Sequence, residues 1–255
     1  MRAALVLAAA LVAAPAWAAP AATPQAGPGS ISGVWSMQGY VSSRNPPRTR
    51  VARTIDGRIP GMQPWAAELL EKRLSDAEQG RIFANTAAYC LPQGTPYMLF
   101  AAVTGPIQIL ETPGQVTLLS EEFNERWLIY LDQPHAAPGD VEPTFHGDSV
   151  AKWDKGDLVV DSVGLTTRTT LDQVGMPHSD ALHVITRLHR ASADTLEFIV
   201  TIDDPKTFTE TWQRKVTYRK APPGERLYED NCENQRNAPD ADGQQTFHLP
   251  AAPTP

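Results

Sequence analysis

Short runs in which apolar and polar residues alternate fill most of the chain and predict β-strands. The clearest run is 195–203, where every second residue from Leu196 to Ile202 is apolar and one strand face is therefore apolar. Turn-forming pairs such as Pro113-Gly114 separate these runs. The predicted strands are 31–37, 97–103, 107–111, 115–122, 127–131, 157–165, 183–189, 195–203 and 214–219.

One segment, 64–79, shows the helical period instead. Its apolar residues Trp65, Leu69 and Leu70 recur at helical spacing, and Pro64 suits the first turn of a helix. About eight to ten strands with a single helix in the N-terminal half favour a mainly β fold, an antiparallel barrel or sandwich, over a parallel α/β sheet. We expect one domain.

The two ends of the chain are predicted to lie outside that domain. Residues 1–18 combine a positive start, an apolar run and an A-x-A cleavage pattern at 16–18, which are typical of a secretory signal peptide. Residues 19–30 are predicted to form a disordered leader, 31–236 a single β-barrel domain, and 237–255 a flexible tail. We therefore expect a periplasmic or secreted protein with no membrane span after signal removal.

Cys90 and Cys232 are the two cysteines of the chain. In an exported protein the simplest expectation is one disulfide between them. A reactive thiol is the alternative, but neither cysteine lies in a C-x-x-C pattern or at a predicted helix start. A disulfide would hold the segment around Cys90 against the C-terminal part of the domain.

Composition excludes several partners and cofactors. The chain has 22 Lys and Arg against 29 Asp and Glu, with a formal net charge of −7, whereas nucleic-acid binding needs a basic surface. It contains no G-x-G-x-x-G and no P-loop, so no nucleotide cofactor is expected. The sequence predicts no cofactor of any kind.

The stretch 147–187 carries more ionisable residues than structural strands need. Period two places His183 and Arg187 on one strand face, and a barrel interior can form a ligand cavity with a few convergent polar groups. Histidine paired with a carboxylate transfers protons near neutral pH, and Arg187 would stabilise a developing oxyanion or phenolate. The predicted catalytic residues are His183, Arg187, Asp161, His135 and His146, and the predicted substrate-binding residues are Tyr130, Asp132 and His178.

Each assignment has a structural alternative. A strand face that mixes charged and apolar groups is normally a solvated outer face. His178 can instead stabilise its own loop, and Asp157 is typical of a turn. No H-x-H or H-E-x-x-H occurs, so no metal site is predicted, and the absence of G-x-S-x-G argues against a serine hydrolase.

Several short segments together carry a family resemblance. They include Ser32-Gly33-Val34-Trp35, Cys90-Leu91-Pro92, Gly147-Asp148-Ser149, Gly156-Asp157-Leu158-Val159-Val160-Asp161, Pro177-His178-Ser179 and Asp203-Asp204-Pro205. In these the chain resembles a large family of exported, mostly uncharacterised bacterial proteins with a lipocalin-like (calycin) barrel. The resemblance implies an antiparallel barrel in which Arg214 or Arg219 covers Trp35. The chain departs from the family in an inserted Lys155 and in Thr186, where a glutamate is usual.

Two function classes follow. The first is an exported, cofactor-independent enzyme that applies His/Asp acid-base chemistry to a small apolar, aromatic molecule such as a lignin fragment, in a lyase, ether-cleaving or isomerase reaction. The second is a lipocalin-like carrier of an apolar ligand, and a metal-dependent hydrolase is a further alternative. A carrier needs one or two ionisable groups inside the barrel, whereas catalysis needs at least three. A homo- or hetero-oligomeric partner that completes the site stays open.

Overall fold

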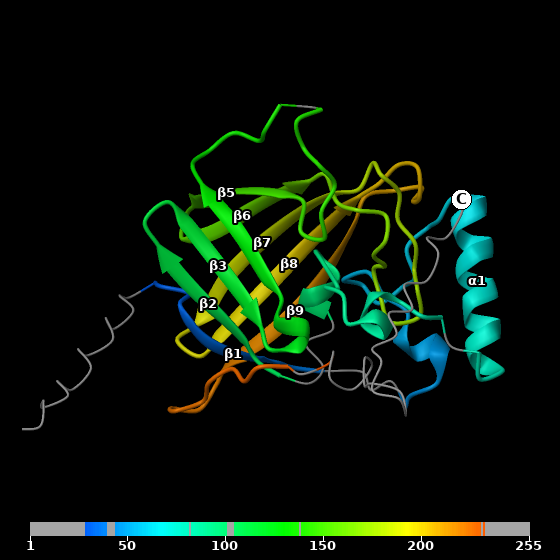
Figure 1. The fold of residues 1–255 in the computed structure, drawn as a ribbon, viewed down its shortest axis with the longest axis horizontal. Helices are drawn as coiled ribbons and strands as arrows, with labels where there is room; N and C mark the ends of the chain where they lie inside the picture. Colours follow the sequence, from blue (N-terminus) through cyan, green and yellow to red (C-terminus); the bar gives the residue numbers. More distant parts are fainter. Residues whose placement is uncertain are drawn as a thin grey trace, which may run out of the picture.

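Nine β-strands close into a barrel in the computed structural model of the protein (Figure 1). The structure describes residues 29–39, 44–81, 83–100, 105–137, 139–230 and 232, so the predicted signal peptide, the predicted tail and most of the predicted leader lie outside the described residues. The strands are β1 (Gly33–Met37), β2 (Ile107–Thr112), β3 (Gln115–Ser120), β4 (Arg126–Leu131), β5 (Asp148–Asp154), β6 (Asp157–Val163), β7 (His183–Ser192), β8 (Thr195–Asp203) and β9 (Trp212–Lys220). The mainly β fold class is confirmed, although the sequence analysis did not predict β5.

Each strand pairs with the next one in sequence, and β9 pairs with β1 to close the barrel. Strands β4 and β5 run parallel, with Tyr130 opposite Val150 and Leu131 opposite Ala151, whereas the other pairs are antiparallel. Nine strands cannot alternate in direction all the way around a closed ring, so one parallel pair is required. The barrel is therefore mixed, which corrects the expectation of a wholly antiparallel one.

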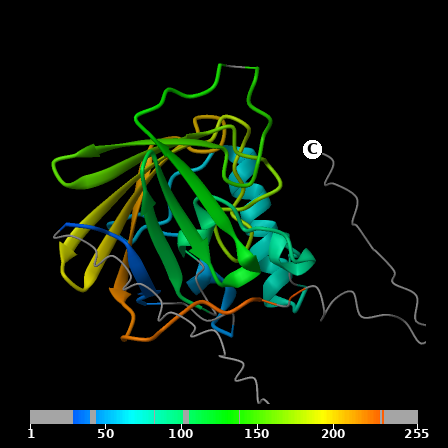
Figure 2. The same ribbon diagram turned by 60° about the vertical axis from the view of Figure 1, so that its left-hand side comes forward.

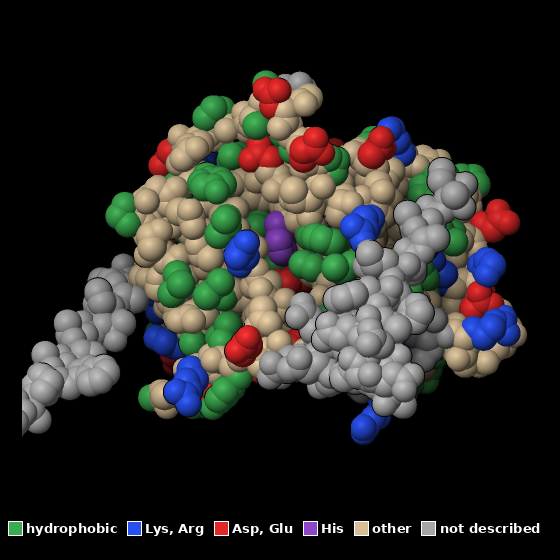
Figure 3. Space-filling model, in the orientation of Figure 1, with side chains coloured by type: hydrophobic (Ala, Val, Ile, Leu, Met, Phe, Trp, Pro, Cys, Tyr) green, Lys and Arg blue, Asp and Glu red, His purple; other side chains and the backbone are tan. Residues whose placement is uncertain are grey.

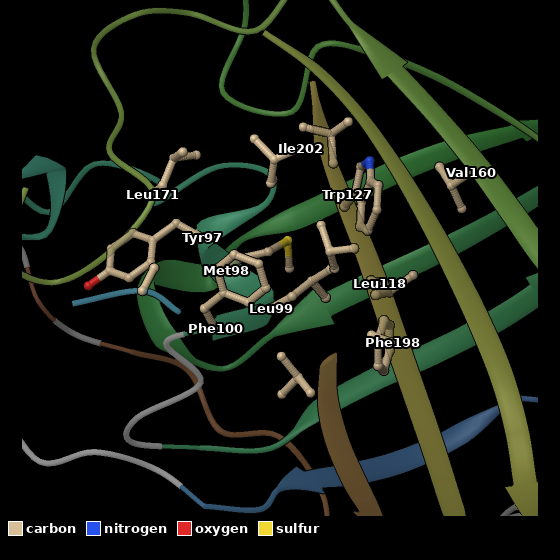
Figure 4. Packing of buried hydrophobic residues seen from close by; sticks show 14 of the residues in the cluster. Tyr97, Met98, Leu99, Phe100, Leu118, Trp127, Val160, Leu171, Phe198 and Ile202 are labelled. Atoms are coloured by element: carbon tan, nitrogen blue, oxygen red, sulfur yellow. The ribbon is translucent and has the colours of Figure 1, made fainter. Parts of the chain in front are cut away.

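Apolar side chains fill the centre of the barrel. On β8, Leu196, Phe198, Val200 and Ile202 are fully buried, as the alternation predicts. Figure 4 shows side chains of the strands, Trp127 among them, packing against those of a short helix inside the barrel. The barrel interior is thus a packed core rather than an open channel.

That short helix, α2 (Tyr97–Phe100), corrects the strand predicted at 97–103. Its four residues are all buried and all apolar or aromatic. A continuous apolar run has no period that separates a buried strand from a buried helix, so the sequence pattern left the two indistinguishable here. Residues 101–104 lie outside the described part of the chain.

The predicted long helix is confirmed as α1 (Pro64–Glu78), with Pro64 in its first turn. It lies outside the barrel wall (Figure 1) and buries Ala66, Leu70 and Leu74. Trp65, although it shares the helical spacing of the apolar residues, is 45% exposed, and its indole N–H donates to the Lys206 carbonyl at 2.8 Å. No helix of the described chain is long and apolar enough to cross a membrane.

The disulfide between Cys90 and Cys232 is present, as the sequence predicted. Cys90 ends the short 3-10 helix η2 (Thr86–Tyr89). The segment after β9, orange in Figure 2, runs along one end of the barrel, and hydrogen bonds join Asp230 to the 3-10 helix η3 (Glu122–Asn124). The C-terminal part of the described chain is therefore held against the barrel end near Cys90.

Candidate functional site

The mixed face of β6 and β7 points away from the barrel interior. On β7, Val184 is buried whereas His183 and Arg187 are partly exposed, and on β6 Val160 is buried whereas Asp161 is partly exposed. The expectation that His183, Arg187 and Asp161 line an interior pocket is therefore wrong. Burying charged groups costs free energy while burying apolar side chains gains it, so the more apolar set faces the core.

Four of the exposed groups form a chain that we call the outer histidine cluster: Asp148, His135, Asp161 and His183. Asp161 Oδ1 lies 2.7 Å from His183 Nε2 and 3.2 Å from His135 Nε2. His135 Nδ1 lies 3.0 Å from Asp148 Oδ2, which also accepts the Ala136 backbone N–H at 2.9 Å. The cluster joins β5, β6, β7 and the β4–β5 connection on the outside of the barrel. It brings three of the predicted catalytic residues together, but on the solvated face.

Arg187, a fourth predicted catalytic residue on the outer face of the barrel, belongs to a separate surface network. Its guanidinium donates to Asp157 and Asp154, both at 2.9 Å, and His189 Nδ1 lies 2.8 Å from the second oxygen of Asp157. The hydrogen bond to Asp154 and, to a smaller extent, the one to Asp157 raise the pKa of the Arg187 guanidinium. Ion pairs of this kind at a surface contribute little to stability, and this arginine lies on the partly exposed face of β7.

His146, the remaining predicted catalytic residue, is buried beside an acid that the sequence analysis missed. Glu125 Oε1 accepts the backbone N–H groups of Gln93 and Gly94, and its Oε2 lies 3.9 Å from His146 Nε2. Thr95 Oγ1 lies 3.1 Å from His146 Nδ1. The facing atoms of the pair, Glu125 Oε2 and His146 Nε2, are buried and make no hydrogen bond within the described structure.

Burial sets the protonation of both groups. It raises the pKa of the Glu125 carboxyl to about 8, opposed by the Gly94 N–H and reinforced by Glu122. It lowers the pKa of His146 to about 4. Near neutral pH the two groups are therefore a protonated acid and a free imidazole, and their separation is too long for a hydrogen bond. No sequence pattern marked Glu125, because the pairing depends on contact between the start of β4 and the residues before β5.

The predicted substrate-binding residues do not gather in one place. His178 is buried, with Nε2 2.7 Å from Thr169 Oγ1 and Nδ1 donating to the Ser179 carbonyl, so it stabilises its loop. Tyr130 is 38% exposed on the outside of β4, and Asp132 is exposed in the turn that follows. Figure 3 shows one face of the molecule, on which apolar side chains lie among charged ones.

A cavity of about 300 Å³ lies where β1 leaves β9, and we call it the rim cavity. Strand β9 forms one side, and the 3-10 helix η1 (Pro47–Arg50), α2 and the loop at 172–173 form the others. None of the described histidines lines it. The lining residues are Met37, Gln38, Gly39, Thr49, Arg50, Val51, Tyr97, Phe100, Asp172, Gln173, Arg214, Lys215, Val216 and Thr217.

Arg214 is the notable charge of the rim cavity. It shares the inward face of β9 with the buried residues Trp212 and Val216, and its guanidinium carbon lies 4.3 Å from the centre of the Phe100 ring. Trp35, which the resemblance paired with Arg214 or Arg219, instead donates its indole N–H to the Ile31 carbonyl. That expectation is corrected: Arg214 faces the cavity over Phe100.

Sequence reasoning missed the cavity although β9 contains a signal for it. An arginine between Trp212 and Val216, on an otherwise apolar strand face, indicates a charged group that points inward. Asp172 had no such signal, because it lies in a loop. Its two oxygens accept the backbone N–H groups of Ala52, Val174 and Met176, and burial nevertheless raises the pKa of its carboxyl.

Comparison with models of protein families, with curated proteins and with solved structures gave no match. The assignment of function to this chain therefore depends on the geometry above. Within the described ranges, no group of three or more His, Cys, Asp or Glu side chains is arranged to hold a metal ion. The outer histidine cluster, the Glu125–His146 pair and the rim cavity are the three arrangements that remain to be interpreted.

Proposed function

We propose that the protein binds a small molecule with an aromatic or other apolar part in the rim cavity, as a lipocalin-like carrier does. The observation that carries this proposal is a cavity of about 300 Å³ lined by Tyr97, Phe100 and Val216 together with one inward-pointing arginine. Pockets for small molecules combine apolar walls with a few convergent polar groups and begin at about this volume. Mouths of β-barrels are a common place for them.

The residues that line the rim cavity favour binding without catalysis, because no described histidine is among them. The histidines predicted to act as acid and base lie in the outer histidine cluster or beside Glu125, and none of those described borders the cavity. A proton-transfer group must come within hydrogen-bond reach of the substrate. A ligand in the rim cavity would meet Asp172, but backbone N–H groups already engage both oxygens of that carboxylate.

An acid-base enzyme is the second candidate, supported by the Glu125–His146 pair. A carboxyl that is protonated near neutral pH and a free imidazole, with unbonded atoms facing each other, are typical of groups held for proton transfer. The lyase, ether-cleaving or isomerase reaction on aromatic molecules belongs to this candidate. It predicts turnover that Glu125→Gln abolishes.

Export belongs to the proposal as well. The A-x-A pattern at 16–18 and the resemblance to exported bacterial proteins support a periplasmic or secreted location. The disulfide between Cys90 and Cys232 fits an oxidising compartment, because such bonds persist there and are rare in the cytosol.

Isothermal titration calorimetry with one-ring aromatic compounds tests the proposed function. Val216 borders the rim cavity, so Val216→Phe fills part of its volume, and we expect at least tenfold weaker binding. Val159→Phe on the outer face of β6 is the matched control and should bind as the wild type does. Binding that Val216→Phe leaves unchanged, or no binding of any compound, would contradict the proposal. Chemical conversion of the same compounds would favour the enzyme candidate.

A further inference from the structure

We propose that the ligand of the rim cavity is an aromatic carboxylate and that Arg214 and Arg50 bind its carboxylate group. This inference rests on the proposed function, because it assigns a ligand chemistry to the same cavity. It depends on two guanidinium groups that face one cavity and form no ion pair within the described part of the chain.

Arg214 makes no hydrogen bond or ion pair with any described residue, and its guanidinium carbon lies over the face of the Phe100 ring. Burial lowers the pKa of its guanidinium, and the carboxylate of Asp172 partly offsets this. A partly buried cation without hydrogen-bond partners is costly, whereas an anion that accepts two hydrogen bonds from the guanidinium fork relieves that cost. The arrangement is therefore suited to a carboxylate.

Arg50 reaches the same cavity from the end of η1. Its Nε atom is buried and has no hydrogen-bond partner within the described structure, and the residue forms no ion pair there. Other arginines near η1 behave differently, since Arg48 pairs with Glu71 and Glu78. Two like charges beside one small cavity repel each other, and an anion between them would reverse that interaction.

Asp172 is the one acid among the residues that line the rim cavity, so it could compete with a ligand for the two arginines. Both of its oxygens point toward backbone donors: Oδ1 accepts the N–H groups of Val174 and Met176, and Oδ2 accepts that of Ala52 at 2.8 Å. Its hydrogen-bonding capacity is thus largely used to order the loop beside the cavity. The arginine donors remain available to a ligand.

The size and walls of the cavity point to a single aromatic ring. A cavity of about 150 Å³ holds benzene, so about 300 Å³ accommodates one ring with its substituents. Tyr97 and Phe100 supply aromatic walls, and Val216 and Met37 supply aliphatic ones. Aromatic pairs and a ring against aliphatic groups both contribute favourably.

Benzoate and benzamide separate charge from shape, because the two molecules are nearly the same size and only benzoate is an anion. We expect the wild-type protein to bind benzoate at least tenfold more tightly than benzamide in calorimetric titrations. Arg214→Met and Arg50→Met should each reduce this preference at least fivefold. Arg126→Met, on the exposed outer face of β4, is the matched control and should keep it.

The outcomes distinguish the inference from the proposed function. Equal affinity for benzoate and benzamide in the wild type would overturn the inference, and this result does not depend on whether any variant folds. A benzoate preference that survives in both Arg214→Met and Arg50→Met, with wild-type near-ultraviolet circular dichroism, would overturn it as well. If benzamide binds and Val216→Phe abolishes that binding, the proposed function stands even where the charge preference fails.

Discussion

Glu125→Gln should remove the pH dependence of stability that arises from the buried carboxyl of Glu125. Glu125 is 3% exposed, and burial raises the pKa of its carboxyl from 4.5 in the unfolded chain to about 8. The folded state therefore holds a proton that the unfolded state releases as the pH rises above 4.5. The stabilisation that Glu125 gains from this proton is fully present below the pKa of Glu125 in the unfolded chain, and it is lost as the pH rises through the pKa of Glu125 in the folded protein.

His146 acts in the opposite direction over part of this range. Burial lowers its pKa from 6.5 to about 4, so above pH 4 the unfolded chain binds a proton that the folded state does not, and stability rises with pH until about 6.5. The two effects offset each other between pH 4.5 and 6.5. From pH 6.5 to 8 the contribution of Glu125 is no longer offset by that of His146, and at about 1.4 kcal/mol per pKa unit it lowers the free energy of unfolding by about 2 kcal/mol.

Urea unfolding at pH 6.5, 7.0, 7.5 and 8.0 measures this fall. Glu125→Gln keeps the shape of the neutral carboxyl but cannot ionise, so we expect its free energy of unfolding to stay level where that of the wild type declines. Glu68→Gln, at an exposed position of α1, is the control for loss of a surface carboxylate. Equal slopes in the wild type and Glu125→Gln would refute the assignment of a protonated, buried Glu125.

Three further perturbations test other parts of the structure. Asp172→Ala leaves three buried backbone N–H groups without their acceptor, and we expect urea unfolding to show a loss of about 3 kcal/mol or more, whereas an unchanged midpoint would contradict the loop geometry. Replacing Cys90 and Cys232 by alanine opens a loop closed over 142 residues and should lower the free energy of unfolding by about 4–5 kcal/mol in chemical denaturation, whereas an unchanged free energy would contradict this estimate. Arg187→Ala removes two partly exposed ion pairs, so the unfolding midpoint should fall only slightly and ligand affinity should match the wild type, and a loss of affinity would move the site to the outer face.

Alternation along the strands was enough to predict most of the barrel. In β8 every second residue is fully buried, because a strand with one apolar face has a single favourable orientation toward the core. The run Tyr97–Phe100 carried no such information, and a buried helix formed where a strand was predicted. Strand β5 escaped prediction because polar Ser149 lies on its buried face and apolar Val150 on its outer face, which breaks the alternation of apolar and polar residues.

The candidate site was harder to predict than the fold. Alternation assigns the residues of β7 to two faces but does not say which face is inside. Polar Thr186 lies on one face and apolar Ile185 on the other, so polarity alone did not separate the inner face from the outer one. The functional interpretation of His183 depended on that choice and placed it on the wrong side. The arginine on the apolar face of β9 was a readable signal, whereas Glu125 and Asp172 depend on contacts between distant segments.

Intermolecular nuclear Overhauser effects between bound benzoate and the methyl groups of the protein test the central claim most directly. The rim cavity predicts contacts from the ring protons to the methyls of Met37 and Val216. Contacts to Val150 and Ile185, which flank the outer histidine cluster, would instead place the ligand on the outside of the barrel and contradict the account.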